Sequence, residues 1–231
     1  ATISQDYDCL TYGFSARADW RAEVLGLYQQ KSQFRVYRHN TFFGDFELSV
    51  PGRHNVANAL ACMAVADYAG LSVPQIKAAL SLFTGAHRRF QIIGSTNGAI
   101  VVDDYAHHPT EIAATILAAK EGWPSRQIVA VFQPHRYSRT QLLFDEFTRC
   151  FKEADVIIVT DNYAPPPEQA IPDVSYSVLA DRIRDYSGSK KVYHIPRQED
   201  VVPFLKAWLS GSDLVLVMGA GPIWRVASDL V

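Results

Sequence analysis

The sequence predicts an α/β protein in two parts: a C-terminal doubly wound, mainly parallel sheet, preceded by a smaller part of short antiparallel strands and helices. Before residue 50, apolar and polar residues alternate in short runs, as in half-buried antiparallel strands. From residue 99, short apolar runs alternate with amphipathic segments, which is typical of strand–helix–strand units with right-handed crossovers. We place the boundary so that residues 1–90 and 91–231 form the two domains.

The N-terminal part begins with four strand-like runs, which we expect to form a small antiparallel meander. The runs are residues 10–14, 20–28, 34–37 and 42–50. Pro51 and Gly52 end the last run, and an alanine-rich helix is predicted over residues 55–68, before Gly70. A second helix is predicted over residues 74–83.

The C-terminal part consists of strands that each lead into a helix. The predicted strands are residues 100–102, 128–132, 156–160, 192–195 and 214–218, and the predicted helices are residues 109–120, 138–152, 175–185, 199–209 and 223–230. Pro109 suits the first turn of a helix, and Ser138 with Gln141 predicts a capping box. Residues 161–172, with three consecutive prolines, predict an extended loop over the sheet edge.

Composition excludes several classes of protein. With 48% hydrophobic and 20% charged residues the chain is an ordinary globular protein, and a net charge of −2 gives no general attraction for nucleic acid or an anionic membrane. The three cysteines are far apart and odd in number, which favours reduced thiols over a disulfide framework or a zinc site. No apolar run approaches the length of a membrane span. We therefore expect a cytoplasmic protein without nucleic-acid or membrane partners.

Two polar segments, residues 103–111 and 132–140, each follow a predicted strand and lead into a predicted helix. Ligands bind at such strand ends in α/β sheets, because helix N-termini converge there. The candidate side chains are Asp104, Tyr105, His107, His135, Arg136 and Arg139. Imidazoles can relay a proton, and paired guanidiniums can hold a carboxylate or phosphate.

Each of these groups also has a structural interpretation. Asp103 and Asp104 can cap the next helix, and a lone histidine is more often structural than functional. Arg136 and Arg139 can form salt bridges to Asp145 or Glu146. The grouping of histidines on two turns that we expect to be neighbours favours a functional site.

Three further motifs carry weaker signals. Asn55 and Asn58 have the spacing that places two amides on one helix face, where they can pair with a purine edge or simply cap the helix. Arg88 and Arg89 form a basic spot before the domain boundary. Residues 219–221 resemble half of a dinucleotide fingerprint, although a tight strand-to-helix turn is the better interpretation. The sequence contains no Gly-x-x-x-x-Gly-Lys-Ser/Thr phosphate loop.

These motifs, in this order, resemble the Mur ligase family over essentially the whole chain. The segments that carry the resemblance are residues 51–58, 88–90, 103–111, 132–140 and 219–224. The resemblance implies the last part of a central ATPase domain, followed by a complete Rossmann-like domain that binds the incoming amino acid. It also implies that the phosphate loop and the Mg²⁺ ligands precede Ala1, so that this chain holds no metal ligand.

Within the family, the segment at residues 133–140 implies an ATP-dependent amide ligase that joins L-alanine to UDP-N-acetylmuramate through an acyl phosphate, inactive as this portion alone. The pathway is peptidoglycan synthesis, which serves cell-wall biogenesis, cell shape and cell division. The alternatives are a noncatalytic ligand-binding module of the same fold and the related ligase that recycles murein tripeptide.

The resemblance also implies roles for individual residues. It implies that His54, Asn55 and Asn58 line the adenine pocket for ATP. It also implies that Asp104 holds the ribose and that Arg89 reaches toward the phosphates. It assigns L-alanine and the tetrahedral intermediate to a pocket, with His107, Arg136 and Arg139 as its catalytic members. The pocket residues are Tyr105, His107, His135, Arg136 and Arg139.

Overall fold

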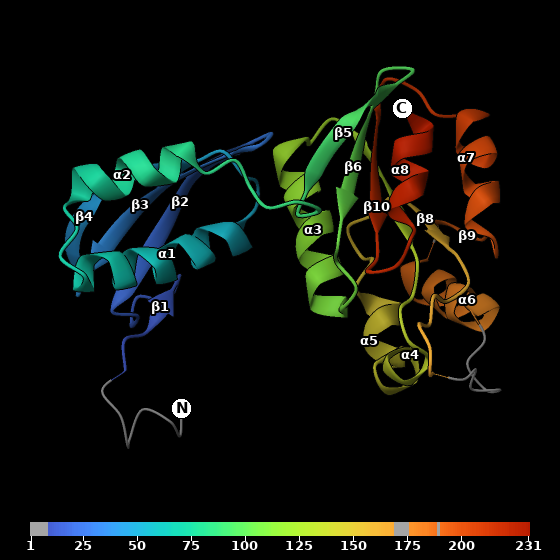
Figure 1. Ribbon diagram of the computed structural model, residues 1–231, viewed down its shortest axis with the longest axis horizontal. Helices are drawn as coiled ribbons and strands as arrows, with labels where there is room; N and C mark the ends of the chain where they lie inside the picture. The colour runs from blue at the N-terminus through green and yellow to red at the C-terminus, as the bar shows by residue number, and fades with distance from the viewer. Residues whose placement is uncertain (1–8, 169–175, 189) are drawn as a thin grey trace. The chain divides into compact units, whose positions relative to one another are not determined.

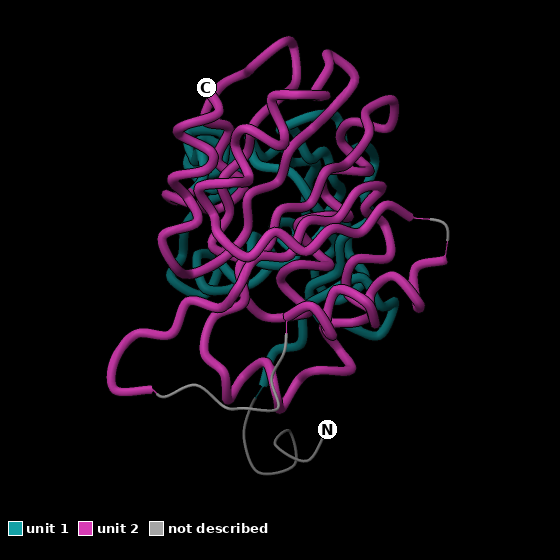
Figure 2. Tube along the Cα trace, turned by 90° about the vertical axis from the view of Figure 1, so that its right-hand side faces the viewer, with its two compact units in different colours: residues 1–85 teal, residues 86–231 magenta. Residues whose placement is uncertain are grey.

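A computed structural model describes residues 9–168, 176–188 and 190–231 (Figure 1). The chain divides into two compact units, Ala1–Gly85 (unit 1) and Ala86–Val231 (unit 2), shown in two colours in Figure 2. This division lies before residues 88–90, which therefore belong to unit 2. Residues 169–172 of the expected proline-rich loop, and residue 175 of the expected helix after it, lie outside the described residues.

Unit 1 contains a four-stranded sheet in the order β1-β2-β3-β4. Its strands are β1 (Tyr12–Gly13), β2 (Trp20–Tyr28), β3 (Lys31–Arg38) and β4 (Thr41–Leu48). The antiparallel meander is confirmed for β2, β3 and β4, but it is wrong for β1, which pairs parallel with β2. Asp19 closes the loop between β1 and β2. It accepts hydrogen bonds from the backbone N and the Oγ1 of Thr11, at 2.8 and 2.7 Å.

Two helices cover the core of unit 1, as expected. Helix α1 (Arg53–Tyr68) packs against β2 and β3, and α2 (Val73–Leu82) packs against β4. Ser72 and Gln75 form a capping box at the start of α2. The buried side chains include Trp20, Phe34 and Leu60, each of which contributes about 1.5–3 kcal/mol through burial.

Unit 2 contains a six-stranded sheet in the order β5-β6-β10-β7-β8-β9. Its strands are β5 (Gln91–Thr96), β6 (Ala99–Asp104), β7 (Gln127–Phe132), β8 (Val156–Val159), β9 (Lys191–His194) and β10 (Asp213–Met218). All neighbours pair parallel except β5, which runs antiparallel to β6. The mainly parallel sheet is confirmed. Strand β5 was not predicted, because only Ile92 and Ile93 in it are large and apolar.

Helices cover both faces of this sheet (Figure 1). They are α3 (Pro109–Gly122), α4 (Tyr137–Leu142), α5 (Phe144–Arg149), α6 (Tyr176–Ser187), α7 (Gln198–Lys206) and α8 (Trp224–Leu230). Side chains of α3, α5 and α6 fill the core on one face, and those of α7 and α8 fill the core on the other. Among the described residues, no helix is both long and apolar enough to cross a lipid bilayer.

The single helix predicted over residues 138–152 is wrong. The chain turns at Leu143, with φ −111° and ψ 26°, so that α4 and α5 are separate helices. Leu143 and Phe147 pack into the core, while Leu142 is 81% exposed. The predicted capping box of Ser138 is also wrong, because Ser138 bonds to the distant Glu168 instead.

The strand order creates a topological switch point at the carboxyl ends of β6, β10 and β7. Strand β10 lies between β6 and β7 and leads into α8, on the opposite face from α3 and α5. Where neighbouring strands lead to helices on opposite faces, the chain diverges and leaves room for a ligand. Both polar segments found in the sequence follow strands at this point.

Candidate active site at the strand ends

Rings from three turns form a row at the carboxyl edge of the sheet. The ring centroids of Tyr105 and His107 are 5.1 Å apart, and those of His107 and His135 are 6.1 Å apart. Tyr163, from the loop after β8, continues the row at 6.0 Å from His135. The expectation that the turns after β6 and β7 are close neighbours is therefore confirmed.

Arg136 and Arg139 are the cationic groups of this site. Arg136 precedes α4 with a positive φ of 69°, an unfavourable conformation for a residue with a side chain. Its backbone N donates to the Tyr163 carbonyl at 3.2 Å, which holds the turn. Among the residues that the structure describes, neither guanidinium forms an ion pair, so the salt bridges to Asp145 or Glu146 are not made. Both charges remain available to an anion.

His135 lies against these cations. Nη1 of Arg139 is 3.5 Å from Nδ1 of His135. Burial lowers the pKa of His135, and the positive charges of Arg139, His107 and Arg136 lower it further. Since an ordinary histidine titrates near pH 6.5, His135 is a neutral imidazole at neutral pH.

Glu111 fixes the turn that carries His107. Its Oε2 accepts hydrogen bonds from the backbone N of His107 and of His108, at 3.0 and 3.2 Å, and lies 3.4 Å from Nδ1 of His107. Burial raises the pKa of Glu111, but these bonds and the neighbouring positive charges outweigh it, so the pKa is lower than usual. His108 caps α3 by accepting from the N of Thr110 at 3.3 Å. Of the two neighbouring histidines, His108 is thus structural.

A buried ion pair joins the ends of β6 and β10. Nε of Arg88 donates to Oδ2 of Asp103 at 2.9 Å, and Nη2 donates to the carbonyl of Gly219 at 2.7 Å. The side chains are only 13% and 5% exposed. Burial raises the pKa of Asp103, and Arg88 partly opposes this. Asp103 therefore serves as the anchor of Arg88 and not as a helix cap.

Asp104 supports the same turn, and its expected role at a ribose stays a prediction. Its carboxylate accepts hydrogen bonds from the backbone N of Phe90 and of Ala106, both at 2.8 Å, and from Oγ1 of Thr115 at 3.3 Å. The residue is 4% exposed, and burial raises its pKa. Both oxygens of Asp104 are therefore engaged inside unit 2, where they hold the turn.

The turn after β10 requires glycine at positions 219 and 221. Gly219 has a φ of 152°, and a Cβ atom on Gly221 would lie 2.6 Å from Oε1 of Gln133 and 2.8 Å from the ring of Tyr163. The expected interpretation as a tight strand-to-helix turn agrees with this geometry. Gln133 is 6% exposed, and its Oε1 has no hydrogen-bond partner among the described residues.

Sequence reasoning missed the contributions of Tyr163 and Glu168. Oε1 of Glu168 accepts hydrogen bonds from the backbone N of Ser138 at 3.0 Å and from its Oγ at 2.6 Å, which ties the loop after β8 to the start of α4. These bonds keep the pKa of Glu168 below its usual range. The polar and aromatic residues of the proline-rich loop were the available signal, since that loop was expected at the sheet edge.

The remaining candidates lie elsewhere. In unit 1, His54, Asn55 and Asn58 occupy the first turns of α1, where Nδ2 of Asn55 donates to the carbonyl of Pro51 at 2.8 Å and Asn58 is exposed. In unit 2, Arg89 is half-exposed, 5.7 Å above the Tyr105 ring and 3.8 Å from Oε1 of Glu111.

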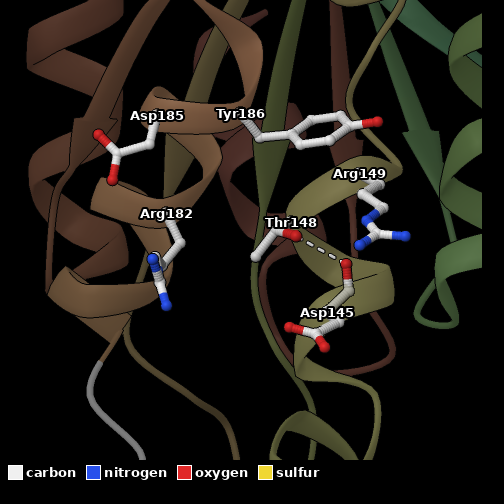
Figure 3. Close-up of a pocket in the computed structure, with 6 residues that line it drawn as sticks. All are labelled: Asp145, Thr148, Arg149, Arg182, Asp185 and Tyr186. Carbon is white, nitrogen blue, oxygen red and sulfur yellow. Dashed lines mark hydrogen bonds between the residues drawn. The ribbon is translucent and has the colours of Figure 1, made fainter.

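A hollow of about 350 Å³ lies between α5 and α6 and not at the strand ends (Figure 3). On the α5 side, Oγ1 of Thr148 donates to the carbonyl of Asp145 at 2.6 Å. Its lining residues are Asp145, Thr148, Arg149, Arg182, Asp185 and Tyr186. Two arginines are matched by two aspartates there, so this hollow lacks the excess positive charge of the strand-end site.

Fold and site together define a class of protein: an α/β domain with two arginines, free of ion pairs among the described residues, and two histidines at the switch point of its sheet. A family model described as Mur ligase, glutamate ligase domain matches residues 88–221, which is more than half of the chain. The Mur ligase middle domain matches residues 1–66. The chain therefore belongs to the Mur ligase family.

Individual relatives agree with this assignment. The UDP-N-acetylmuramate--L-alanine ligase of Symbiobacterium thermophilum is 46% identical over 95% of this chain and 45% of its own length. The enzyme of the same name from Trichlorobacter lovleyi is 44% identical over 96% of this chain and 48% of its own length. The chain thus spans about half the length of the curated relatives it matches.

Solved structures show the same fold. The UDP-N-acetylmuramate-alanine ligase MurC of Thermotoga maritima matches with a TM-score of 0.82 and 27% identity, over 99% of this chain and 48% of that one. A murein peptide ligase from Psychrobacter arcticus matches with a TM-score of 0.62 and 26% identity, over 95% of this chain and 45% of that one. A MurF ligase from Thermotoga maritima in complex with ADP, 16% identical and with a TM-score of 0.72, covers 99% of this chain and 48% of its own.

Proposed function

We propose that this chain supplies the amino-acid-binding part of an ATP-dependent ligase that joins L-alanine to UDP-N-acetylmuramate in cytoplasmic peptidoglycan synthesis. The observation that carries the proposal is the pair of guanidiniums, Arg136 and Arg139, which meet no carboxylate among the described residues and lie beside His107 and His135. The names of the relatives at 46% and 44% identity support the choice of substrates.

In this proposal Arg136 and Arg139 bind the carboxylate of L-alanine. A guanidinium presents its donors in a planar fork that matches both oxygens of a carboxylate, and charge-assisted bonds of this kind are the strong ones. Tyr105 closes the side of the pocket that takes the methyl group. Pocket size alone discriminates by about 1–3 kcal/mol per methylene, so the carboxylate contact provides most of the recognition.

His107, Arg136 and Arg139 are the proposed catalytic groups, and Tyr105 and His135 complete the pocket. The carboxyl group of UDP-N-acetylmuramate accepts the γ-phosphoryl group of ATP, and the amine of L-alanine then displaces phosphate to form the amide. Reactions of this kind depend mainly on positioning and on stabilisation of developing charge. Fixed cations and imidazoles at one sheet edge supply both.

For the nucleotide we propose adenine contacts from His54, Asn55 and Asn58 in unit 1. Asn58 is exposed, and Asn55 keeps its Oδ1 as an acceptor while Nδ2 is bonded to Pro51. Such an acceptor suits the exocyclic amine of adenine. In unit 2, Arg89 is half-exposed and is proposed for the phosphates.

The described residues do not fit a Mg²⁺ site. They contain no group of three or more His, Cys, Asp or Glu side chains that could hold a metal ion. Mg²⁺ prefers oxygen ligands, chiefly carboxylates and phosphates, in octahedral geometry. We therefore assign no step of the reaction to a metal held by these residues.

The protein expressed from its complete reading frame tests the proposal. We expect ADP release that requires both UDP-N-acetylmuramate and L-alanine, with formation of the alanyl product. A preference for murein tripeptide over L-alanine would identify the recycling ligase instead. Absence of ADP release with either substrate, in protein that is folded, would support a noncatalytic binding module.

A further inference from the structure

The hydrogen bonds of His107 and His135 place their protons on different ring nitrogens. Nδ1 of His107 is 2.8 Å from the carbonyl oxygen of Tyr105. Because a carbonyl oxygen only accepts, Nδ1 is the donor, and the neutral ring has its lone pair on Nε2. No residue in the described part of the chain hydrogen bonds to that Nε2.

His135 has the opposite arrangement. Nη1 of Arg139 lies 3.5 Å from its Nδ1, and a guanidinium only donates. Nδ1 of His135 is therefore the acceptor, and the neutral ring carries its proton on Nε2. Its position among Arg139, Arg136 and His107 opposes a second proton on this ring.

We propose that His107 accepts a proton from the amine of the incoming amino acid and that His135 donates a hydrogen bond to the oxygen that becomes negative as the amide forms. This inference rests on the proposed ligase function. The ring centroids are 6.1 Å apart, so both imidazoles can reach one small reacting group. Glu111, with Oε2 3.4 Å from Nδ1 of His107, stabilises the imidazolium that results.

The ammonium group of the amino acid loses one proton to Nε2 of His107, and the nitrogen lone pair forms the C–N bond with the acyl carbon. The electron pair of the C=O bond moves onto oxygen, where Nε2–H of His135 donates to it. When that pair returns, the C–O bond to phosphate breaks and the phosphate leaves with its electrons. The nitrogen of the adduct still carries one proton more than the amide, and the departing phosphate takes that second proton, which gives the neutral amide and hydrogen phosphate.

Hydroxylamine separates proton removal from acyl transfer. It is largely unprotonated at neutral pH, so it attacks an acyl phosphate without a base and yields a hydroxamate. The variant His107→Asn retains a donor for the Tyr105 carbonyl but has no atom at the position of Nε2. We expect the ratio of alanyl product to hydroxamate to fall by about 10²–10⁴-fold in this variant, the range typical of general base catalysis.

His108→Asn is the matched control. His108 caps α3 and is exposed, and asparagine is itself a good helix cap, so the ratio should equal that of the wild type. His135→Ala, which has no donor at the position of Nε2, should lower both rates together, because the oxygen that His135 stabilises is common to both nucleophiles. If His107→Asn does not fold, His107→Gln gives the same test, since its amide cannot accept the proton.

Two outcomes separate the inference from the function on which it rests. If His107→Asn lowers both rates equally, or lowers neither, His107 does not take the proton and the inference is wrong. If the wild type forms neither amide nor hydroxamate from UDP-N-acetylmuramate and ATP, the proposed ligase function itself fails. A fall of the ratio in His107→Asn but not in His108→Asn supports the inference.

Discussion

Replacing Arg88 by leucine removes the cation that anchors the ends of β6 and β10. Asp103 would remain buried without a partner, since its side chain is 5% exposed and its bond to Arg88 is 2.9 Å long. Breaking a buried pair in this way costs about 3–5 kcal/mol. The carbonyl of Gly219 also loses its 2.7 Å donor, which costs about 1–3 kcal/mol more. Typical domains have only about 5–15 kcal/mol of stability, so the loss is severe.

The pH dependence of this loss has a definite sign. Burial already raises the pKa of Asp103 above its unfolded value, and loss of Arg88 raises it further. A carboxyl group with a raised pKa stabilises the fold below its unfolded pKa, and that stabilisation is lost as the pH rises through the folded pKa. The Arg88→Leu variant should therefore be most destabilised at neutral pH and partly recover as the pH falls.

Urea unfolding of the whole chain measures the effect, with hydrogen exchange of β6 and β10 to follow unit 2 by itself. The double variant Arg88→Leu/Asp103→Asn is the control, because a neutral amide removes the buried charge and should restore most of the loss. If Arg88→Leu lowers the free energy of unfolding by less than about 1 kcal/mol, as at an exposed ion pair, and the change does not depend on pH, the reasoning is refuted.

Three further predictions concern the geometry of the site. Gly221→Ala should cost about 1–3 kcal/mol in free energy of unfolding, through steric overlap at the turn, and should lower kcat/KM for L-alanine; an unchanged kcat/KM would contradict this. Glu168→Ala should raise KM for L-alanine by releasing Ser138 at the start of α4, whereas Glu168→Gln, which keeps an acceptor, should not. In an NMR titration His135 should protonate at a lower pH than a histidine in a short peptide, and Arg139→Gln should raise its pKa because a neighbouring cation is removed.

Much of the fold follows from local patterns in the sequence. Every strand from β6 to β10 was predicted, because each is a short apolar run between helices. The insertion of β10 between β6 and β7 was not predicted, because strand order depends on crossovers that local patterns do not encode. Strand β5 and the break at Leu143 were missed for a related reason: packing against distant residues decides both.

The site was predicted in part. Two strand-end turns with imidazoles and guanidiniums were visible in the sequence, because strands of a parallel sheet end at one edge. The hydrogen bonds that hold these turns were not predicted, because they join residues far apart in the sequence. Arg88 is 131 residues from Gly219, and Ser138 is 30 residues from Glu168. The hydrogen bonds of Asp104 to Phe90 and Thr115 were not predicted either, because alternation along one strand cannot reveal partners on other segments.

The central claim is that Arg136 and Arg139 recognise the carboxylate of the incoming amino acid. Ethylamine, which is alanine without its carboxylate, tests it most directly as a competing nucleophile. Hydrogen bonds to charged groups contribute about 1.5–3 kcal/mol, so Arg136→Ala should reduce the preference for L-alanine over ethylamine in kcat/KM by about 10- to 150-fold. An unchanged preference, with both nucleophiles affected equally, would contradict the account.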